Sequence, residues 1–279
     1  MKASVIIAVY QDFEALELIF ESLVYQTYKN FEVVVAEDGR SDRMNEFIAL
    51  ARTKYDFPII HTTQEDTGVR KSKSQNNGIK AAQGEYLIFI DGDCILYSNF
   101  IENHIALSAK KSVITGRRVN MGPKYSKQLR GRSITSLELE KKFIQKYLDI
   151  REDAKDERHS EEGFKIKPNG LIDKLIKKIR KKEFPMLGCN MSCYKKAMLD
   201  INGFDEGLGN SAMAGDTDLT WRFRGLGYNI VSARYIANQF HLYHKRNPDD
   251  YDRSLDEKML SNQKNHTFRC TDGIVKLAH

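Results

Sequence analysis

The chain has little of what marks a membrane-spanning, secreted or zinc-stabilised protein. None of its apolar runs approaches the roughly 18–20 consecutive residues that cross a bilayer. The apolar start at residues 1–9 is too short for a signal peptide and has no cleavage site. The four cysteines form neither a Cys-x-x-Cys pair nor a zinc-ligand spacing. We therefore expect a cytoplasmic protein with reduced thiols.

Features of nucleic-acid binding are also missing. The formal net charge is only +6 over 279 residues, and the basic runs lack interleaved aromatic platforms and any recognised binding motif. A charge of this size suits an anionic partner such as a nucleotide or a membrane surface. With 41% hydrophobic and 29% charged residues and five prolines, the composition is that of a globular protein with a substantial core.

The first hundred residues alternate between apolar strands and amphipathic helices. Strands are expected at residues 4–9, 31–36, 57–61 and 85–90, and helices at residues 13–25, 41–54 and 72–83. Short connections between them predict an α/β fold with a mostly parallel central sheet and helices on both faces. Such sheets bind ligands at the carboxyl ends of their strands, where Asp38, Asp91 and Asp93 fall.

Four regions are expected along the chain. Residues 1–116 and 184–248 form the two halves of the α/β domain, residues 117–183 a basic helical insertion, and residues 249–279 a C-terminal segment with a helix at 255–268. Residues 171–182 of the insertion have an apolar stripe and a cationic face. Such a helix either lies on an anionic membrane surface or packs on its own domain with a solvated basic face.

Acidic residues that follow predicted strands are the main chemical signal. Asp91-Gly92-Asp93 ends an apolar strand, and paired carboxylates suit Mg²⁺ or Mn²⁺ bridging phosphate oxygens, with a solvated polar turn as the alternative. The glycine permits close backbone approach. Asp38 is placed to accept a hydrogen bond from a pyrimidine ring N–H. It also precedes a helix that Ser41 is able to cap.

Three further segments make the pattern specific: residues 185–192 (PMLGCNMS), 202–206 (NGFDE) and 215–219 (GDTDL). In order with residues 5–10 (VIIAVY), Asp38 and Asp91-Gly92-Asp93, they resemble family 2 glycosyltransferases of the GT-A fold, the fold of nucleotide-diphospho-sugar transferases. The match spans about residues 3–110 and 184–245. Its C-terminal part is similar to the galactosyltransferase-type region of β-1,4-galactosyltransferases and polymerising N-acetylhexosaminyltransferases.

The resemblance implies a role for each matching position. The residues expected around the nucleotide sugar are Ala8, Val9 and Tyr10 at uridine, Asp38 at uracil, Asn76 near the donor, and Asp91 with Gly92 at the ribose or donor sugar. Gln75 replaces the family's usual arginine, so Arg70 or Lys73 is expected to supply the positive charge. The expected metal ligands are Asp93, His244 and His241, although a histidine is also often purely structural. The acceptor is expected at Gly188, Asn190 and Asp218.

Asp216 is the expected catalytic base. Inverting transfer needs a carboxylate that takes the proton of the acceptor hydroxyl, apart from the acid that binds the metal. Asp93 fits the role of the metal ligand and Asp216 that of the base. The alternative for Asp216 is an acidic residue that only stabilises the N-terminus of a helix. The family usually has Glu-Asp where this chain has Gly215-Asp216. The base is kept, but a residue that often contacts the acceptor is absent.

We therefore expect an inverting enzyme, dependent on Mn²⁺ or Mg²⁺, that moves a hexose or N-acetylhexosamine from a UDP-sugar to a hydroxyl of a glycan or lipid-linked glycan. Synthesis of surface polysaccharide or lipopolysaccharide at the inner face of the plasma membrane is the expected setting. A nucleotidyltransferase is one alternative, but residues 10–14 lack its glycine-rich phosphate loop. A weakly catalytic nucleotide-sugar or glycan-binding module is the other, supported only by Gly215.

Overall fold

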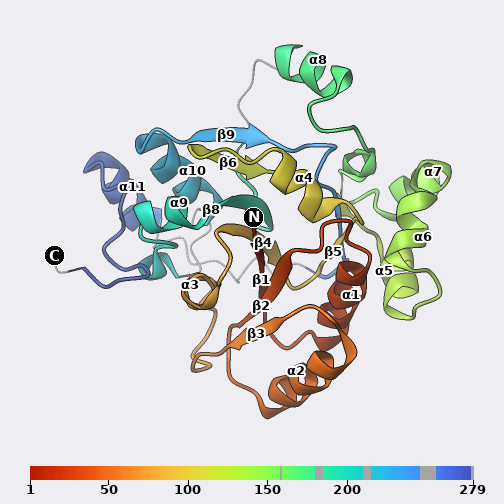
Figure 1. Ribbon diagram of the computed structural model, residues 1–279, viewed down its shortest axis with the longest axis horizontal. Coiled ribbons are helices and arrows are strands. Elements are labelled where there is room, and N and C mark those ends of the chain that lie inside the picture. The colour runs from red at the N-terminus through yellow and green to blue at the C-terminus, as the bar shows by residue number, and fades with distance from the viewer. Residues whose placement is uncertain (158, 180–184, 210–214, 246–255, 278–279) are drawn as a thin grey trace.

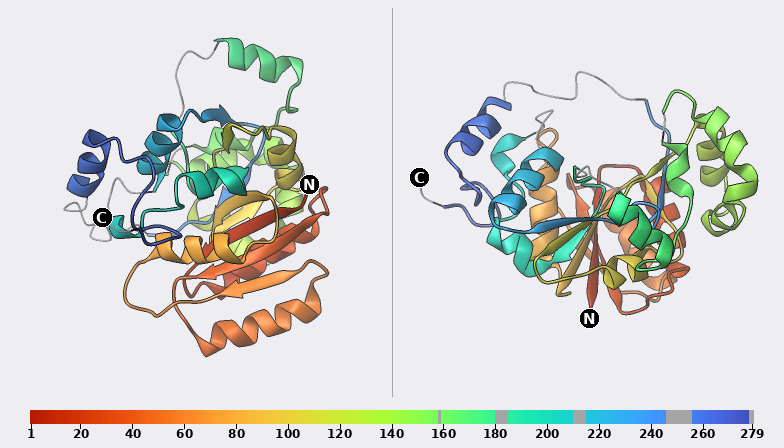
Figure 2. Two further views of the ribbon diagram at one scale, coloured as in Figure 1. Left: turned by 60° about the vertical axis from the view of Figure 1, so that its left-hand side comes forward. Right: turned by 90° about the horizontal axis from the view of Figure 1, so that it is seen from above.

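A seven-stranded sheet forms the centre of the molecule in the order β3-β2-β1-β4-β8-β6-β9 (Figures 1 and 2). The computed structural model describes residues 1–157, 159–179, 185–209, 215–245 and 256–277. The strands of this sheet are β1 (Ala3–Val9), β2 (Phe31–Glu37), β3 (Ile59–Thr62), β4 (Tyr86–Asp91), β6 (Ser112–Thr115), β8 (Asn190–Tyr194) and β9 (Asn229–Ser232). A three-stranded sheet in the order β5-β10-β7 contains β5 (Cys94–Leu96), β7 (Val119–Asn120) and β10 (Gln239–His241).

Helices cover both faces of the large sheet, as the sequence predicts. One face is covered by α1 (Phe13–Val24), α2 (Asp42–Lys54) and α4 (Phe100–Ala106), and the other by α3 (Lys71–Ala81), α9 (Lys195–Asp200) and α10 (Asp216–Gly225). The expected cap is present, because the Ser41 hydroxyl accepts a hydrogen bond from the backbone N–H of Met44 at 3.0 Å. The remaining α-helix near the C-terminus is α11 (Asp256–Lys264), and η2 (Glu206–Leu208) is a short 3₁₀ helix.

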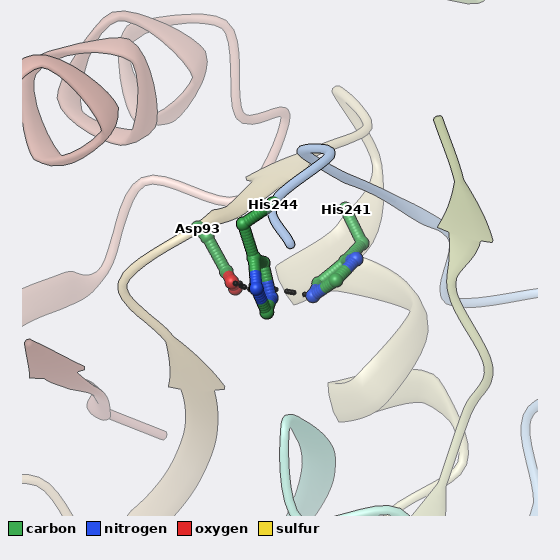
Figure 3. Close-up of side chains that lie close together, drawn as sticks. All are labelled: Asp93, His241 and His244. Atoms are coloured by element: carbon green, nitrogen blue, oxygen red, sulfur yellow. Dashed lines mark ion pairs between the residues drawn. The ribbon is translucent and has the colours of Figure 1, made fainter. Parts of the chain in front are cut away.

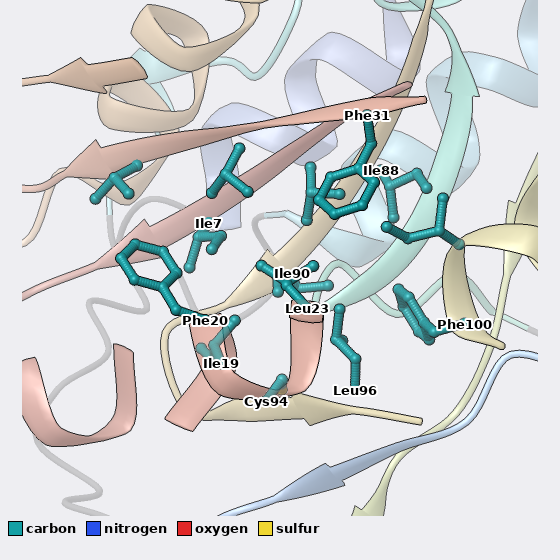
Figure 4. Packing of buried hydrophobic residues seen from close by; sticks show 14 of the residues in the cluster. Ile7, Ile19, Phe20, Leu23, Phe31, Ile88, Ile90, Cys94, Leu96 and Phe100 are labelled. Carbon is teal, nitrogen blue, oxygen red and sulfur yellow. The ribbon is translucent and has the colours of Figure 1, made fainter. Parts of the chain in front are cut away.

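The core lies on both faces of the sheet because side chains of a strand alternate between them. In β1, Val5 and Ile7 pack against α1, whereas Ile6 packs on the α3 side. Figure 4 shows the first of these clusters, where Ile19 and Phe20 of α1 meet the sheet. Strands buried on both faces need nearly continuous apolar sequence, which is why β1, β2 and β4 were predictable.

The sheet is mostly parallel, but β8 runs antiparallel between β4 and β6. In its register Ile90 lies opposite Asn190 and Tyr86 opposite Tyr194. The chain entering β8 therefore reaches the sheet at the edge where β1, β2 and β4 end. Residues 185–190, far along the sequence, are brought to the carboxyl ends of the first strands.

The insertion supplies β7, α5 (Pro123–Arg130), α6 (Ser136–Lys141), α7 (Phe143–Asp153), the 3₁₀ helix η1 (Ser160–Gly163) and α8 (Leu171–Ile179). Its helices α5–α7 bury apolar residues against the small sheet, whereas α8 projects away from the body (Figure 1). Residues 180–182 of the expected helix, residue 255 of the C-terminal one and the expected region boundaries at 183/184 and 248/249 lie outside the described residues. Among the described helices, none has the length and apolarity to cross a membrane.

Candidate active site

A pocket of about 460 Å³ opens where β1, β2 and β4 end. Of the predicted site residues, those that line it are Ala8, Val9, Tyr10, Asp38, Asp91, Gly92, Asp93 and His244. Neighbouring ends are tied by the backbone N–H of Asp38, which donates to the Val9 carbonyl at 2.9 Å. A methyl group on Gly92 would lie 3.0 Å from the Ala8 carbonyl oxygen, so glycine lets the acidic turn approach β1.

Asp93, His241 and His244 point at one another beside this pocket (Figure 3). Pairing of β10 with β5 places His241 opposite Cys94, and the backbone N–H of Leu242 donates to the Asp93 carbonyl at 3.0 Å. Asp93 Oδ2 lies 3.2 Å from His241 Nε2 and 3.4 Å from His244 Nε2. His241 is buried, whereas 52% of the His244 side chain is exposed. The predicted trio is thus assembled by the small sheet.

The chemistry of this trio fits a divalent cation. Burial opposes a charge on Asp93, yet the hydrogen bonds from His241 and His244 hold the pKa of its carboxyl well below the usual range. The same bond to Asp93 raises the pKa of His244. The donor atoms of the three residues all lie within 4.8 Å of one another. A carboxylate oxygen and two imidazole nitrogens suit a transition metal better than Mg²⁺, which prefers oxygen ligands.

Asp38 occupies the end of β2 as a buried acceptor. Its two oxygens accept from the Gln64 side chain at 2.6 Å and from the backbone N–H of Arg70 at 2.8 Å. Burial nevertheless raises the pKa of the Asp38 carboxyl. The Arg70 guanidinium donates to the Glu65 carbonyl instead of lining the pocket. Arg70 thus contributes its backbone here, and not the positive charge that was expected of it.

Lys71 brings positive charge into the pocket, and no sequence pattern indicated it. Its ammonium group pairs with Asp91. Burial opposes the charge, but the carboxylate of Asp91 outweighs it and raises the pKa of Lys71. Lys71 is the first residue of α3, so the helix start aims it at the strand ends. Arg130 of the insertion also lines the pocket and pairs with Asp12 at 2.7 Å, a contact between distant segments that no local pattern indicates.

Asp216 begins α10 and is held by the segment before β8. Its Oδ1 accepts from the backbone N–H of Gly188 at 2.7 Å. A methyl group on Gly188 would lie only 2.5 Å from that oxygen, so glycine is needed for this contact. Burial raises the pKa of the Asp216 carboxyl, while Lys71 and Arg118 act in the opposite direction. Gly188, expected at the acceptor, thus positions the predicted base.

Three other predicted ligand contacts lie in the interior instead. Asn76 is fully buried and donates to the Phe204 carbonyl at 2.9 Å, so it ties α3 to the segment before η2. Asn190 is fully buried too, and its side-chain amide donates to the carbonyls of Arg117 and Ala237 at 2.7 and 2.9 Å. Asp218 is 1% exposed and forms a 2.6 Å ion pair with Arg222. The amides of Asn76 and Asn190 and one carboxylate oxygen of Asp218 are thus used in holding the fold.

Residues 4–192 match the profile of Glycosyl transferase family 2. The chain belongs to this family. The chain is 33% identical over 114 residues to an uncharacterized glycosyltransferase of Rickettsia felis, a match covering 40% of this chain and 18% of the relative. The chain spans less than a fifth of the length of the first curated relatives it matches. Family membership favours glycosyl transfer over the nucleotidyltransferase alternative.

Solved structures support the GT-A fold of the chain. Staphylococcus aureus TarS, residues 1–349 in complex with UDP, matches with a TM-score of 0.53 and 18% identity, over 96% of this chain and 72% of that one. GalNAc-T7 with UDP, GalNAc and Mn²⁺ matches with a TM-score of 0.58 and 13% identity, over 88% and 44%. The family profile ends at residue 192, so the similarity of the later part to a galactosyltransferase-type region stays a prediction.

Proposed function

We propose that this glycosyltransferase moves a hexose or N-acetylhexosamine from a UDP-sugar to a hydroxyl of a glycan, with inversion at the anomeric carbon. The observation that carries the proposal is the Asp93, His241 and His244 trio beside a pocket that also contains Asp38 and Asp91. UDP in complex with TarS and with GalNAc-T7 supports the choice of nucleotide.

The nucleotide is proposed to lie with its base at Asp38 and its diphosphate toward the trio. Each Asp38 oxygen accepts one hydrogen bond from the protein, and a carboxylate oxygen has lone pairs for a second, here the uracil N–H. Asp93, His241 and His244 would hold Mn²⁺, which their mixed nitrogen and oxygen donors favour over Mg²⁺. When bound, the metal supplies positive charge that stabilises the departing diphosphate.

Asp216 is proposed as the base. Its carboxylate accepts the proton of the acceptor hydroxyl as that oxygen attacks the anomeric carbon, and the bond to UDP breaks on the opposite face. The Gly188 N–H fixes one carboxylate oxygen, which leaves the second oxygen to take the proton. Lys71, paired with Asp91, adds positive charge at the same strand ends. Base and metal ligands thus come from separate elements, α10 and the small sheet.

Contact with an anionic membrane surface is part of the proposal. Helix α8 carries Leu171, Ile172, Leu175 and Ile179 with exposures of 87, 61, 56 and 67%. That exposure argues against a helix whose apolar stripe packs on its own domain. Lys174 and Lys178 are exposed on the same helix and suit anionic lipid headgroups. An acceptor linked to a lipid would then be presented near the enzyme.

A panel of UDP-sugars and one GDP-sugar, incubated with Mn²⁺ and candidate glycans, tests the donor assignment. Release of UDP that depends on both metal and glycan is expected with at least one UDP-sugar, and an Asp93→Asn variant should lose it. Turnover of the GDP-sugar alone would refute the uridine assignment. Retention of the α-anomeric configuration in the product of an α-linked donor, judged by NMR, would refute inversion.

A further inference from the structure

A second hollow, of about 690 Å³, lies along α10 and shares no lining residue with the donor pocket. Pro185, Thr217, Trp221, Arg224, His266 and Phe268 line it. Trp221 is the only tryptophan of the chain, and its side chain is partly exposed. A large aromatic residue with an open face in a hollow is a common feature of ligand sites.

The hollow begins beside the proposed base. Thr217 directly follows Asp216, and the Thr220 hydroxyl on the same side donates to the Asp216 carbonyl at 2.6 Å. From Thr217 the lining residues continue along α10 to Gly225. At 1.5 Å per residue these eight steps span about 12 Å, close to the length of two linked pyranose rings. Asp216 itself does not line the hollow, whose first lining residue on α10 is its direct neighbour Thr217.

Its aromatic rings are held in place by packing. The Trp221 and Phe268 rings lie 4.8 Å apart between centroids at an angle of 42°, and His266 lies 5.9 Å from Phe268. A methyl group on Gly225 would overlap the Phe268 ring. Gly225 therefore lets the segment after α11 bring Phe268 onto α10. The resulting pair of rings is a fixed platform rather than two loose surface side chains.

We propose that this hollow, called here the α10 groove, binds the acceptor saccharide at the units next to the one that receives the sugar. The apolar C–H face of a pyranose would stack on Trp221 and Phe268, while the Thr217 hydroxyl offers a polar group to the sugar hydroxyls. The inference rests on the proposed function, because it takes Asp216 as the base, and it deepens that function by assigning the acceptor to a saccharide of at least two units.

Because Trp221 is the only tryptophan, its fluorescence reports on the groove directly. Titration of the wild-type protein with cellobiose, maltose, lactose and N,N′-diacetylchitobiose should give a saturable change with at least one disaccharide. Phe268→Ala and Gly225→Ala keep the fluorophore and should weaken that binding by about tenfold or more. Alanine is a better helix former than glycine, so Gly225→Ala moves the ring without weakening α10.

Tyr25→Ala, which removes an exposed aromatic ring at the end of α1, is the matched control and should bind as the wild type does. The proposal would be overturned if none of the four disaccharides changed the fluorescence. It would also be overturned if Phe268→Ala and Gly225→Ala bound the disaccharide as tightly as the wild type does. Calorimetric binding of UDP with Mn²⁺ tests the donor pocket separately. If the protein binds a disaccharide but not UDP, only the donor assignment is refuted. If it binds UDP but no disaccharide, only the α10 groove is refuted.

Discussion

Replacing Asp216 by asparagine should remove the proposed base with almost no change in shape. The side-chain oxygen of asparagine still accepts from the Gly188 N–H, a contact of 2.7 Å in the structure, so the start of α10 should be preserved. General-base catalysis typically contributes 10²- to 10⁴-fold. We expect kcat to fall by about that factor, or about 3–5 kcal/mol in the activation barrier, with UDP affinity nearly intact.

The pH dependence provides an independent measure of the same group. Burial raises the pKa of the Asp216 carboxyl, and a base acts only when it is deprotonated. The kcat of the wild type should therefore fall as the pH is lowered through that raised pKa. This limb should lie above the ordinary aspartate value of about 3.9 and should be absent from the residual activity of Asp216→Asn. Initial rates of UDP release across a pH series are the measurement.

Asp42→Asn is the matched control, because Asp42 is also the first residue of a helix but is exposed and does not line the pocket. If Asp216 only stabilised the N-terminus of its helix, each variant would lose about 1 kcal/mol or less in the free energy of unfolding. Both variants would then keep full activity. Activity of Asp216→Asn within about twofold of the wild type would refute the assignment, since a base contributes at least about 10²-fold. The assignment would also be refuted if the kcat of Asp216→Asn fell at low pH as that of the wild type does.

Four other outcomes are expected. Chelation by EDTA should abolish transfer, and Mn²⁺ should restore it better than Mg²⁺. His244→Ala should raise the Mn²⁺ concentration needed for half-maximal activity. Equal rescue by both ions would contradict a metal site of mixed nitrogen and oxygen donors. Asp218→Asn should lower the free energy of unfolding by about 3–5 kcal/mol in urea titrations, because it leaves the buried Arg222 uncompensated; an unchanged midpoint would contradict this. Gly92→Ala should bind UDP more weakly in calorimetry, because the added methyl group crowds the end of β1. If the variant bound UDP as tightly as the wild type does, the turn would have room for the methyl group. Leu175→Glu should reduce flotation with anionic vesicles but not the free energy of unfolding, because Leu175 is 56% exposed; undiminished flotation would exclude α8 as the contact.

Strand-end acids were predictable because their signals are local. Apolar strands β1, β2 and β4 are each followed by a polar turn, and parallel strands end at one edge. Asp38, Asp91 and Asp93 therefore had to meet once the sheet was recognised. The approach of His241 and His244 to Asp93 was expected only from the family resemblance, since it depends on the pairing of β10 with β5.

Interior polar residues were misplaced because their partners lie far away in the sequence. Asn76 and Asn190 look like ligand contacts in the sequence, yet their amides satisfy backbone carbonyls at Phe204 and Ala237. A buried amide and a ligand-binding amide have the same local pattern, and only the tertiary contacts distinguish them. Lys71 was missed for the same reason, since its pairing with Asp91 depends on where α3 begins relative to β4.

The antiparallel strand β8 has a consequence for how the molecule folds. Because Tyr86 pairs with Tyr194, the edge of β4 stays open until the chain beyond the whole insertion has been made. Closing so long a loop is slow, so β1 to β4 should form early and the strands beyond β4 late. Phe240 of β10 must then find Ile95 of β5 across a still longer separation. During synthesis the strand ends that carry Asp38 and Asp91 would take shape well before the histidines reach Asp93, so newly made chains should acquire the proposed nucleotide affinity before the proposed metal affinity.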